Sequence, residues 1–296
     1  MNVVSHSPTQ EPGVVARESA LAANRPSDIV AVATSTSPWN PAVQVAVTLA
    51  ARWQSLLTGC FVDESLRMLR GPESEPSVLG LLLDTPVQDF REGDEFRSFA
   101  RSKGVPHASW VVAHTGLARV LRELGAWHSL AVLERDVVDG ESLSELLGEV
   151  LLSCRLPSLI LPPGWNRDAQ FSRVLVAWDG SAEATRAIHA ALPFLQDARR
   201  VILLDGGRPH SPEGECYLPH FEPFVYMSRH GVEADPMCVG IPARTAGASL
   251  LKKAEQVGAD LIVMGAYGHS RLRERAIGGA TRHMLQHAQI PAFLQH

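Results

Sequence analysis

Apolar and polar residues alternate along the C-terminal half of the chain in two recurring patterns. Short apolar runs occupy residues 173–181, 200–207, 232–240, 260–265 and 290–295. Between them, residues 182–196 and 243–258 carry apolar positions at helical spacing, and Gly258 stands where a helix C-cap is expected. Strands that are largely apolar and alternate with helices predict a parallel sheet covered by helices on both faces.

The N-terminal half repeats this order. The matching apolar runs are residues 28–36, 56–63, 103–112 and 156–163, and residues 115–134 match the helix and strand of residues 245–265. We therefore expect an α/β protein with two tandem open parallel five-stranded sheets, each with helices on both faces, in a Rossmann-like arrangement. The expected divisions are a flexible N-terminal tail at 1–26, a first domain at 27–163 and a second domain at 170–296.

The last strand of each half is apolar enough to need a partner. Residues 156–163 and 290–295 would form exposed apolar edges if each domain stood alone, which favours association. We expect the two halves to pair through these strands as an intramolecular pseudo-dimer, and a homodimer is also possible.

Composition narrows the class of protein. A length of 296 residues fits about two domains, and a formal net charge of −5 without a Lys/Arg block argues against a nucleic-acid partner. The cysteines are few and widely spaced, which fits a reducing compartment; they are Cys60, Cys154, Cys216 and Cys238. No segment approaches the roughly 18 apolar residues that cross a bilayer. We expect a cytoplasmic protein without a membrane partner.

A glycine-rich stretch after the fourth strand carries the candidate chemistry. Gly265, Gly268 and Gly278 lie between a buried strand and the start of a helix. In an open parallel sheet, ligands bind beyond the carboxyl ends of the strands where the winding reverses, so Asp179 after the first strand could face the same crevice. Free N–H groups and a helix dipole suit a phosphate, and glycine permits its close approach. The pattern predicts an anion site, with an ordinary strand end and a flexible turn as the competing interpretation.

The spacing Gly265-x2-Gly268-x9-Gly278 resembles the nucleotide-binding motif of the universal stress protein family. The resemblance in element order covers nearly all of the chain after residue 26, and it implies an adenine nucleotide α-hydrolase-like fold. It also implies that ATP or another adenine nucleotide, possibly with Mg²⁺, binds in the C-terminal half, where Asp179 could also ligate the metal ion. The implied binding residues are Ala177, Asp179, Met264, Gly265, Gly268, His269, Gly278, Gly279, Ala280 and Thr281.

Two departures from the family pattern affect the C-terminal site. Gly279 stands where the motif has Ser or Thr, so a hydroxyl contact to phosphate is lost while the backbone N–H remains. At the end of the second strand, Asp205 and Gly206 replace the apolar residue that forms one wall of the base pocket in the family. Both departures favour weaker binding.

The N-terminal half lacks the motif. Thr34 occupies the place of Asp179 and Glu134 that of Gly265, and Asp136, Asp139 and Glu141 follow and would repel a triphosphate. We expect this half to bind no nucleotide and to act as a structural or regulatory partner.

The resemblance as a whole implies stress adaptation through nucleotide-linked conformation or an unknown protein partner. A nucleotide-free interaction protein and a slow ATPase are the alternatives, and no catalytic residue is indicated.

Other polar groups have weaker cases. His283 and His287 stand four residues apart, a spacing that can hold a metal, but no H-E-x-x-H pattern accompanies them and a packing or surface pair is favoured. A zinc site built from the remaining cysteines and histidines is disfavoured because their spacings are irregular; its members would be Cys216, His220, His230 and Cys238. The arginines of the glycine-rich loop could close over phosphates or solvate the loop, and solvation is favoured for at least two of Arg271, Arg273 and Arg275.

Overall fold

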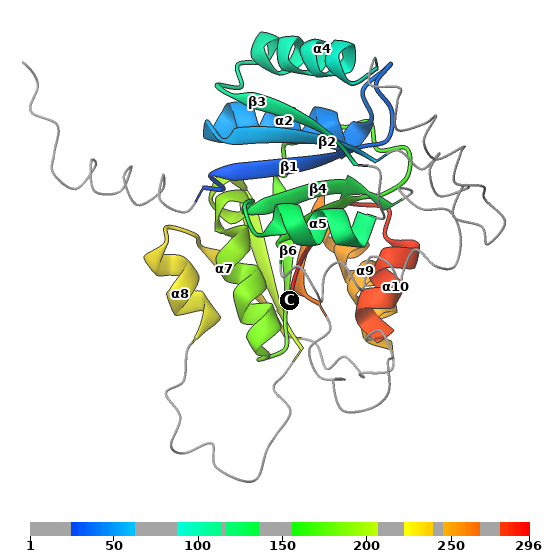
Figure 1. Ribbon diagram of the computed structural model, residues 1–296. Coiled ribbons are helices and arrows are strands. Elements are labelled where there is room, and N and C mark those ends of the chain that lie inside the picture. Colours follow the sequence, from blue (N-terminus) through cyan, green and yellow to red (C-terminus); the bar gives the residue numbers. More distant parts are fainter. Residues whose placement is uncertain are drawn as a thin grey trace, which may run out of the picture.

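The computed structural model describes residues 25–62, 88–113, 117–135, 156–206, 222–238, 245–266 and 279–296 (Figure 1). The N-terminal half contains β1 (Asp28–Ala33), α2 (Pro41–Trp53), β2 (Leu56–Val62), α4 (Gln88–Ser102), β3 (Ala108–Ala113), α5 (Leu117–Gly125), β4 (Leu130–Glu134) and β5 (Ser158–Leu161). The C-terminal half contains β6 (Arg173–Trp178), α7 (Ala182–Asp197), β7 (Arg200–Asp205), α8 (Pro223–Arg229), β8 (Ala234–Cys238), α9 (Ala246–Val257), β9 (Leu261–Gly265), α10 (Gly279–His287) and β10 (Ala292–Gln295).

The strands form one continuous ten-stranded sheet in the order β3-β2-β1-β4-β5-β10-β9-β6-β7-β8. Within each half all neighbouring strands are parallel, which confirms the predicted α/β class. The two five-stranded sets expected from the sequence are joined edge to edge rather than standing as separate sheets.

The junction of the two sets is the antiparallel pair of β5 and β10. Leu159 pairs with Phe293 and Ile160 with Ala292, and every residue of both strands is buried. The expected pairing of the two terminal strands is therefore confirmed, because an apolar edge that would attract another chain is covered by its counterpart. Since the junction is antiparallel, the strands of the two halves point in opposite directions.

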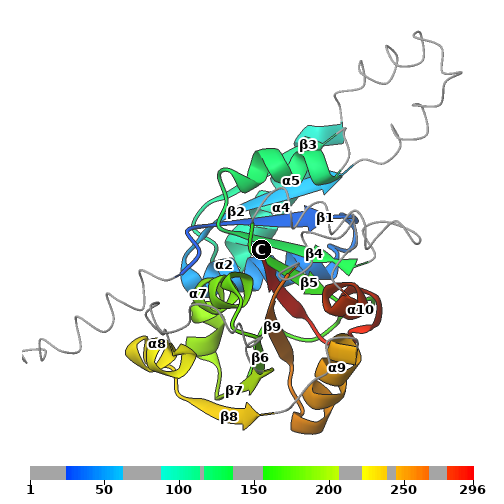
Figure 2. The same ribbon diagram turned by 90° about the horizontal axis from the view of Figure 1, so that it is seen from below.

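Helices cover both faces of the sheet. Buried side chains of α2, α4, α7 and α8 share one apolar cluster with one face of the strands, and those of α5, α9 and α10 share a second cluster with the other face (Figures 1 and 2). Both clusters run through the two halves, so the core is continuous across the β5–β10 junction. None of the helices in the described ranges is both long and apolar enough to cross a membrane.

Helices α2 and α7 bring the two halves together on the first face. The rings of Trp53 and Phe194 meet edge to face with centroids 4.9 Å apart, and Trp53 Nε1 donates to Asp197 Oδ2 at 3.1 Å. Arg52 Nη1 donates to the carbonyl of Ala169 at 3.1 Å, in the segment that connects the halves. On the opposite face, Arg135 Nη1 donates to the carbonyl of Ala288 at 2.9 Å.

Candidate functional site

The candidate site lies at the carboxyl ends of β6 and β9. These strands are neighbours, with Val174 opposite Leu261 and Ala177 opposite Met264, while β7 and β8 continue on the other side of β6. The winding therefore reverses at β6, which is where an open parallel sheet offers a crevice to a ligand. The arrangement brings four of the sequence-predicted residues to the same edge: Ala177, Asp179, Met264 and Gly265.

Asp179 builds the turn between β6 and α7. Its Oδ1 accepts hydrogen bonds from the backbone N–H of Ser181 at 3.0 Å and from the Ser181 hydroxyl at 2.5 Å. Ser181 is in turn the N-cap of α7 and accepts from the N–H of Ala184 at 3.1 Å. The half-buried Asp179 carboxylate is thus held in one orientation at the mouth of the crevice. The sequence interpretation missed Ser181, although Asp-Gly-Ser before a helical run is a recognisable capping signal.

Gly265 is required by packing between β9 and α7. A Cβ built on it would lie 2.5 Å from the backbone nitrogen of Ala184 and 2.7 Å from the carbonyl carbon of Glu183. Only glycine lets the end of β9 reach the first turn of α7 this closely. The N-terminus of α7, with its positive dipole end, is consequently beside the crevice. This partner could not be predicted from the sequence, because the contact joins residues about 80 positions apart.

The glycine-rich loop is described only at its two ends. Gly268, His269 and Gly278 lie outside the described residues, and so do Arg271, Arg273 and Arg275. At the start of the loop, the N–H of Ala266 donates to the carbonyl of Gln295 at 2.8 Å, and His296 Nδ1 donates to the carbonyl of Ala266 at 2.9 Å. Ala266 and His296 are buried, so β10 and the residue after it fix the point at which the loop leaves the sheet.

The far end of the loop leads directly into α10. Gly279 is the first residue of this helix and is exposed, Ala280 is half-buried and Thr281 is buried. A Cβ at Gly279 would meet no described atom within 4 Å, so the position has room for the Ser or Thr of the family motif. The positive end of the α10 helix dipole therefore lies directly after the glycine-rich loop.

The end of β7 lies beside Asp179. Asp205 pairs with Trp178 in the sheet, and the N–H of Gly206 donates to the carbonyl of Trp178 at 2.8 Å. Asp205 and Gly206 therefore line the side of the crevice at which the sequence predicted a thin pocket wall.

The corresponding strand ends of the N-terminal half carry different residues. The strand registers, Ile29 opposite Leu130 and Val174 opposite Leu261, put Thr34 in the place of Asp179 and Glu134 in the place of Gly265.

The Glu134 carboxylate accepts a hydrogen bond from Asn40 Nδ2, and Asn40 also donates to the carbonyl of Val32 at 3.2 Å and accepts from the N–H of Thr34 at 3.3 Å. Asn40 is the buried N-cap of α2, and the sequence interpretation missed it. Of the acidic residues predicted here, Asp136, Asp139 and Glu141 lie outside the described residues. Glu134 and Asn40 therefore lie at the strand ends of the N-terminal half that correspond to the C-terminal site.

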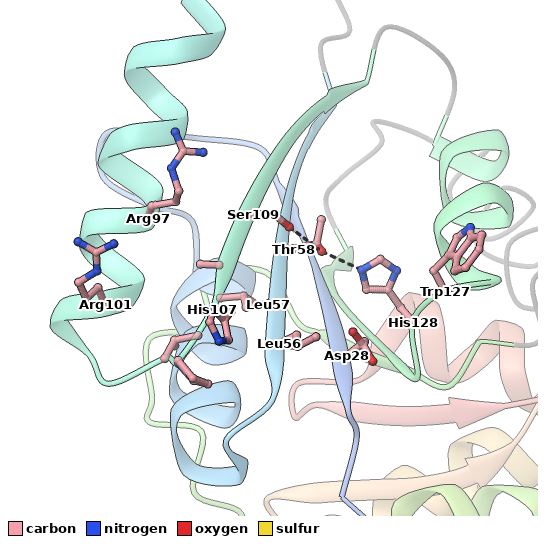
Figure 3. A pocket seen from close by; sticks show the side chains of 13 residues that line it. Asp28, Leu56, Leu57, Thr58, Arg97, Arg101, His107, Ser109, Trp127 and His128 are labelled. Atoms are coloured by element: carbon pink, nitrogen blue, oxygen red, sulfur yellow. Dashed lines mark hydrogen bonds between the residues drawn. The ribbon is translucent and has the colours of Figure 1, made fainter.

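A second hollow lies at the amino ends of β1, β2 and β3 (Figure 3) and has a volume of about 450 Å³. Thr58 Oγ1 lies 3.1 Å from Ser109 Oγ and 2.9 Å from His128 Nε2, so these polar groups bond to one another. Arg97 and Arg101 stand on the other side of the strands, and Arg97 pairs with Asp94 at 2.7 Å. The polar groups do not converge on one point, which makes this hollow a weaker candidate than the β6–β9 crevice.

Cysteine and metal chemistry receive little support from the described residues. Burial raises the pKa of the Cys60 thiol to about 12, which excludes it as a thiolate nucleophile at neutral pH. Within the described ranges, no group of three or more His, Cys, Asp or Glu side chains is placed to hold a metal ion. Two members of the zinc set considered above, Cys216 and His220, lie outside those ranges.

Comparison with known proteins shows a likeness to one family. The family model for the Universal stress protein family matches residues 243–294, which contain α9, β9, the glycine-rich loop and α10. This part of the chain is similar to universal stress proteins. A curated relative, Universal stress protein Slr1230 from Synechocystis sp., is 28% identical over 146 residues, covering 49% of this chain and 48% of the relative. The chain thus spans about half the length of the curated relative that it matches.

Solved structures of universal stress proteins share the fold over most of the chain. A universal stress protein from Archaeoglobus fulgidus aligns with a TM-score of 0.62 and 14% identity, covering 90% of this chain and 95% of that one. A putative universal stress protein from Pseudomonas aeruginosa aligns with a TM-score of 0.59 and 16% identity, covering 93% and 94%. At these identities the likeness concerns the fold, and it supports the arrangement of two family-like halves.

Proposed function

We propose that this protein is a universal stress protein that binds one adenine nucleotide in its C-terminal half and acts as a nucleotide-linked regulator in stress adaptation. The observation that carries the proposal is the meeting of Asp179, Gly265 and the N-terminus of α7 at the carboxyl ends of β6 and β9. A helix N-terminus favours an anion, and one oriented carboxylate offers acceptors to hydroxyl groups.

The proposed roles follow from the position of each group. The N–H groups of the loop and of Gly279, Ala280 and Thr281 bind the phosphates, with Gly268, His269 and Gly278 contributing from the part of the loop outside the described residues. Asp179 accepts hydrogen bonds from the ribose hydroxyls. Ala177 and Met264, which pair across β6 and β9, form the floor of the crevice beneath the nucleotide.

A divalent cation fits this site only when a bound nucleotide supplies phosphate oxygens as further ligands. Asp179 and Asp205 are strand-end carboxylates at the crevice, and oxygen donors of this kind suit Mg²⁺. Mg²⁺ would neutralise charge on a bound triphosphate. The protein residues would contribute by orienting the nucleotide, since the Asp179 carboxylate is already engaged by Ser181 and is poorly suited to activate a water molecule.

The N-terminal half is proposed to be a non-binding partner. The hydrogen-bonded Glu134 and Asn40 lie at its strand ends, and the Glu134 carboxylate would repel a phosphate there. We propose residues 27–163 and 170–296 as the two domains, with an intramolecular partnership through β5 and β10. A cytoplasmic location and an unidentified protein partner belong to the same proposal.

Mass spectrometry of small molecules released from the purified, denatured full chain tests this function. We expect an adenine nucleotide from the wild type and from Thr34→Ala, which alters the equivalent N-terminal position, and much less from Asp179→Ala. Equal recovery from all three proteins would refute the proposed site. A phosphate-release assay on the same preparations separates the slow-ATPase alternative, which requires release that Asp179→Ala abolishes.

A further inference from the structure

Two histidines of α10 lie side by side on one face of the helix. The imidazole rings of His283 and His287 have centroids 4.2 Å apart and an interplanar angle of 19°. Residues four apart on a helix project to the same side, one turn above the other. Two nitrogen ligands of one metal ion, each about 2 Å from it, lie roughly 3 Å apart, so modest rotation of stacked rings can bring two ring nitrogens to that separation.

The hydrogen bonding of His287 prepares it as a ligand. His287 Nδ1 lies 3.0 Å from the carbonyl oxygen of His283, and since a carbonyl only accepts, Nδ1 carries the hydrogen. In the neutral ring the lone pair is then on Nε2, away from the helix backbone. Metal-bound histidines almost always donate their second ring N–H to a carbonyl or carboxylate in this manner, which fixes the tautomer and the ring orientation.

Packing of α10 on α9 fixes the position of His283. A Cβ on Gly247 would lie 2.6 Å from the Cβ of His283, so the two helices touch at this point because Gly247 has no side chain. His283 is half-buried while His287 is exposed, which leaves the pair accessible from one side.

We propose that His283 and His287 form a binding site for a divalent first-row transition-metal ion such as Cu²⁺, Ni²⁺ or Zn²⁺. Imidazole nitrogen suits these ions, whereas Mg²⁺ prefers oxygen ligands. His287 is the last residue of α10, where the negative end of the helix dipole favours a cation. The site has two protein ligands and completes its coordination with water. The sequence alone favoured a packing pair, and the ring arrangement together with the Nδ1 hydrogen bond changes that interpretation.

Titration of the full chain with Cu²⁺, followed by electron paramagnetic resonance, tests the proposal. Cu²⁺ is the divalent ion that such donors bind most tightly, and coupling to ligand nitrogens reports how many imidazoles are bound. We expect a site with two coordinated nitrogens in the wild type. His283→Ala and His287→Ala should each weaken it by about tenfold or more, since even loss of an outer-shell partner costs 10–100-fold in metal affinity.

The matched control is the double variant His189→Ala, His230→Ala, which removes two histidines flanking Tyr226 on α7 and after α8. It should bind Cu²⁺ as the wild type does, and Mg²⁺ should not compete. A site unchanged in both α10 variants, or lost in only one of them, would overturn the proposal. If His283→Ala disturbs the α9–α10 contact, two results still test the proposal: Cu²⁺ binding by the variant of the exposed residue, His287→Ala, and the number of nitrogens coordinated in the wild type. Single-nitrogen coordination in the wild type would contradict the pair.

Discussion

Replacing Gly265 by alanine should destabilise the protein, because the new methyl group would collide with backbone atoms. The added Cβ would lie 2.5 Å from the nitrogen of Ala184, 2.7 Å from the carbonyl carbon of Glu183 and 3.0 Å from the Cα of Ala184. No flexible side chain is available to yield, so either the end of β9 or the first turn of α7 must move.

The size of the effect follows from this geometry. Overpacking of a well-packed region typically costs about 1–3 kcal/mol, and here the clash is with main chain, so we expect the upper part of that range. Movement of the α7 N-terminus would also disturb two hydrogen bonds of the Ser181 hydroxyl, which donates to Asp179 and accepts from the N–H of Ala184. The variant should therefore lose stability with or without nucleotide, and it should bind nucleotide less tightly as well.

Urea denaturation of the nucleotide-free full chain measures the first effect, with Gly279→Ala as the matched control. A Cβ at Gly279 has no described neighbour within 4 Å, and alanine is the better helix former, so this control should be as stable as the wild type or slightly more stable. If Gly265→Ala and Gly279→Ala unfold at the same urea concentration as the wild type, Gly265 is not needed for packing. A loss of nucleotide affinity without loss of stability would assign Gly265 to the ligand alone.

Three further predictions concern the site, the thiols and the junction between the halves. Asp179→Ala should weaken Mg-ATP binding in a calorimetric titration by about 10- to 150-fold, since one or two charge-assisted hydrogen bonds are lost, while Thr34→Ala should change nothing. Cys60, whose pKa burial raises to about 12, should resist iodoacetamide at pH 8 in the native protein, whereas the exposed Cys238 should react, as mapped by mass spectrometry. Residues 170–296 expressed alone should dimerise or aggregate in light scattering, because β10 would lose its partner β5.

Each of these has a distinct contrary result. Equal Mg-ATP affinities for the Asp179 and Thr34 variants would remove Asp179 from the site. Rapid native labelling of Cys60 would show that the sheet around it opens readily. A well-behaved monomer of residues 170–296 would mean that the β10 edge needs no cover.

Much of the fold was predictable because the strands are short, apolar and bounded by turns. The strand registers of the two halves agree with the predicted equivalences, in which Thr34 takes the position of Asp179 and Glu134 that of Gly265. Helices α4 and α8 were not predicted. Helix α4 is largely polar, with Phe96 and Ala100 as buried residues, and α8 has only seven residues, so neither gives a strong periodic signal.

The parts of the site that escaped prediction depend on contacts between distant residues. The approach of Gly265 to Ala184 is a packing contact with no signature in sequence spacing. The bond between Asn40 and Glu134 is similar: the acidic strand end could be read from the sequence, but its partner across 94 positions could not. The sequence predicts that charge repulsion keeps a nucleotide out of the N-terminal half, and the structure adds a hydrogen bond between Asn40 and Glu134 at the equivalent strand ends.

The most direct test of one nucleotide per chain is the stoichiometry of Mg-ATP binding to the full-length protein by isothermal titration calorimetry. The C-terminal half keeps Asp179 and Gly265, while the hydrogen-bonded Glu134 and Asn40 lie at the equivalent strand ends of the N-terminal half. We predict saturation at one nucleotide per chain. Two sites per chain would show that the N-terminal half binds nucleotide as well, and no binding at millimolar nucleotide would contradict the account and favour a nucleotide-free interaction protein.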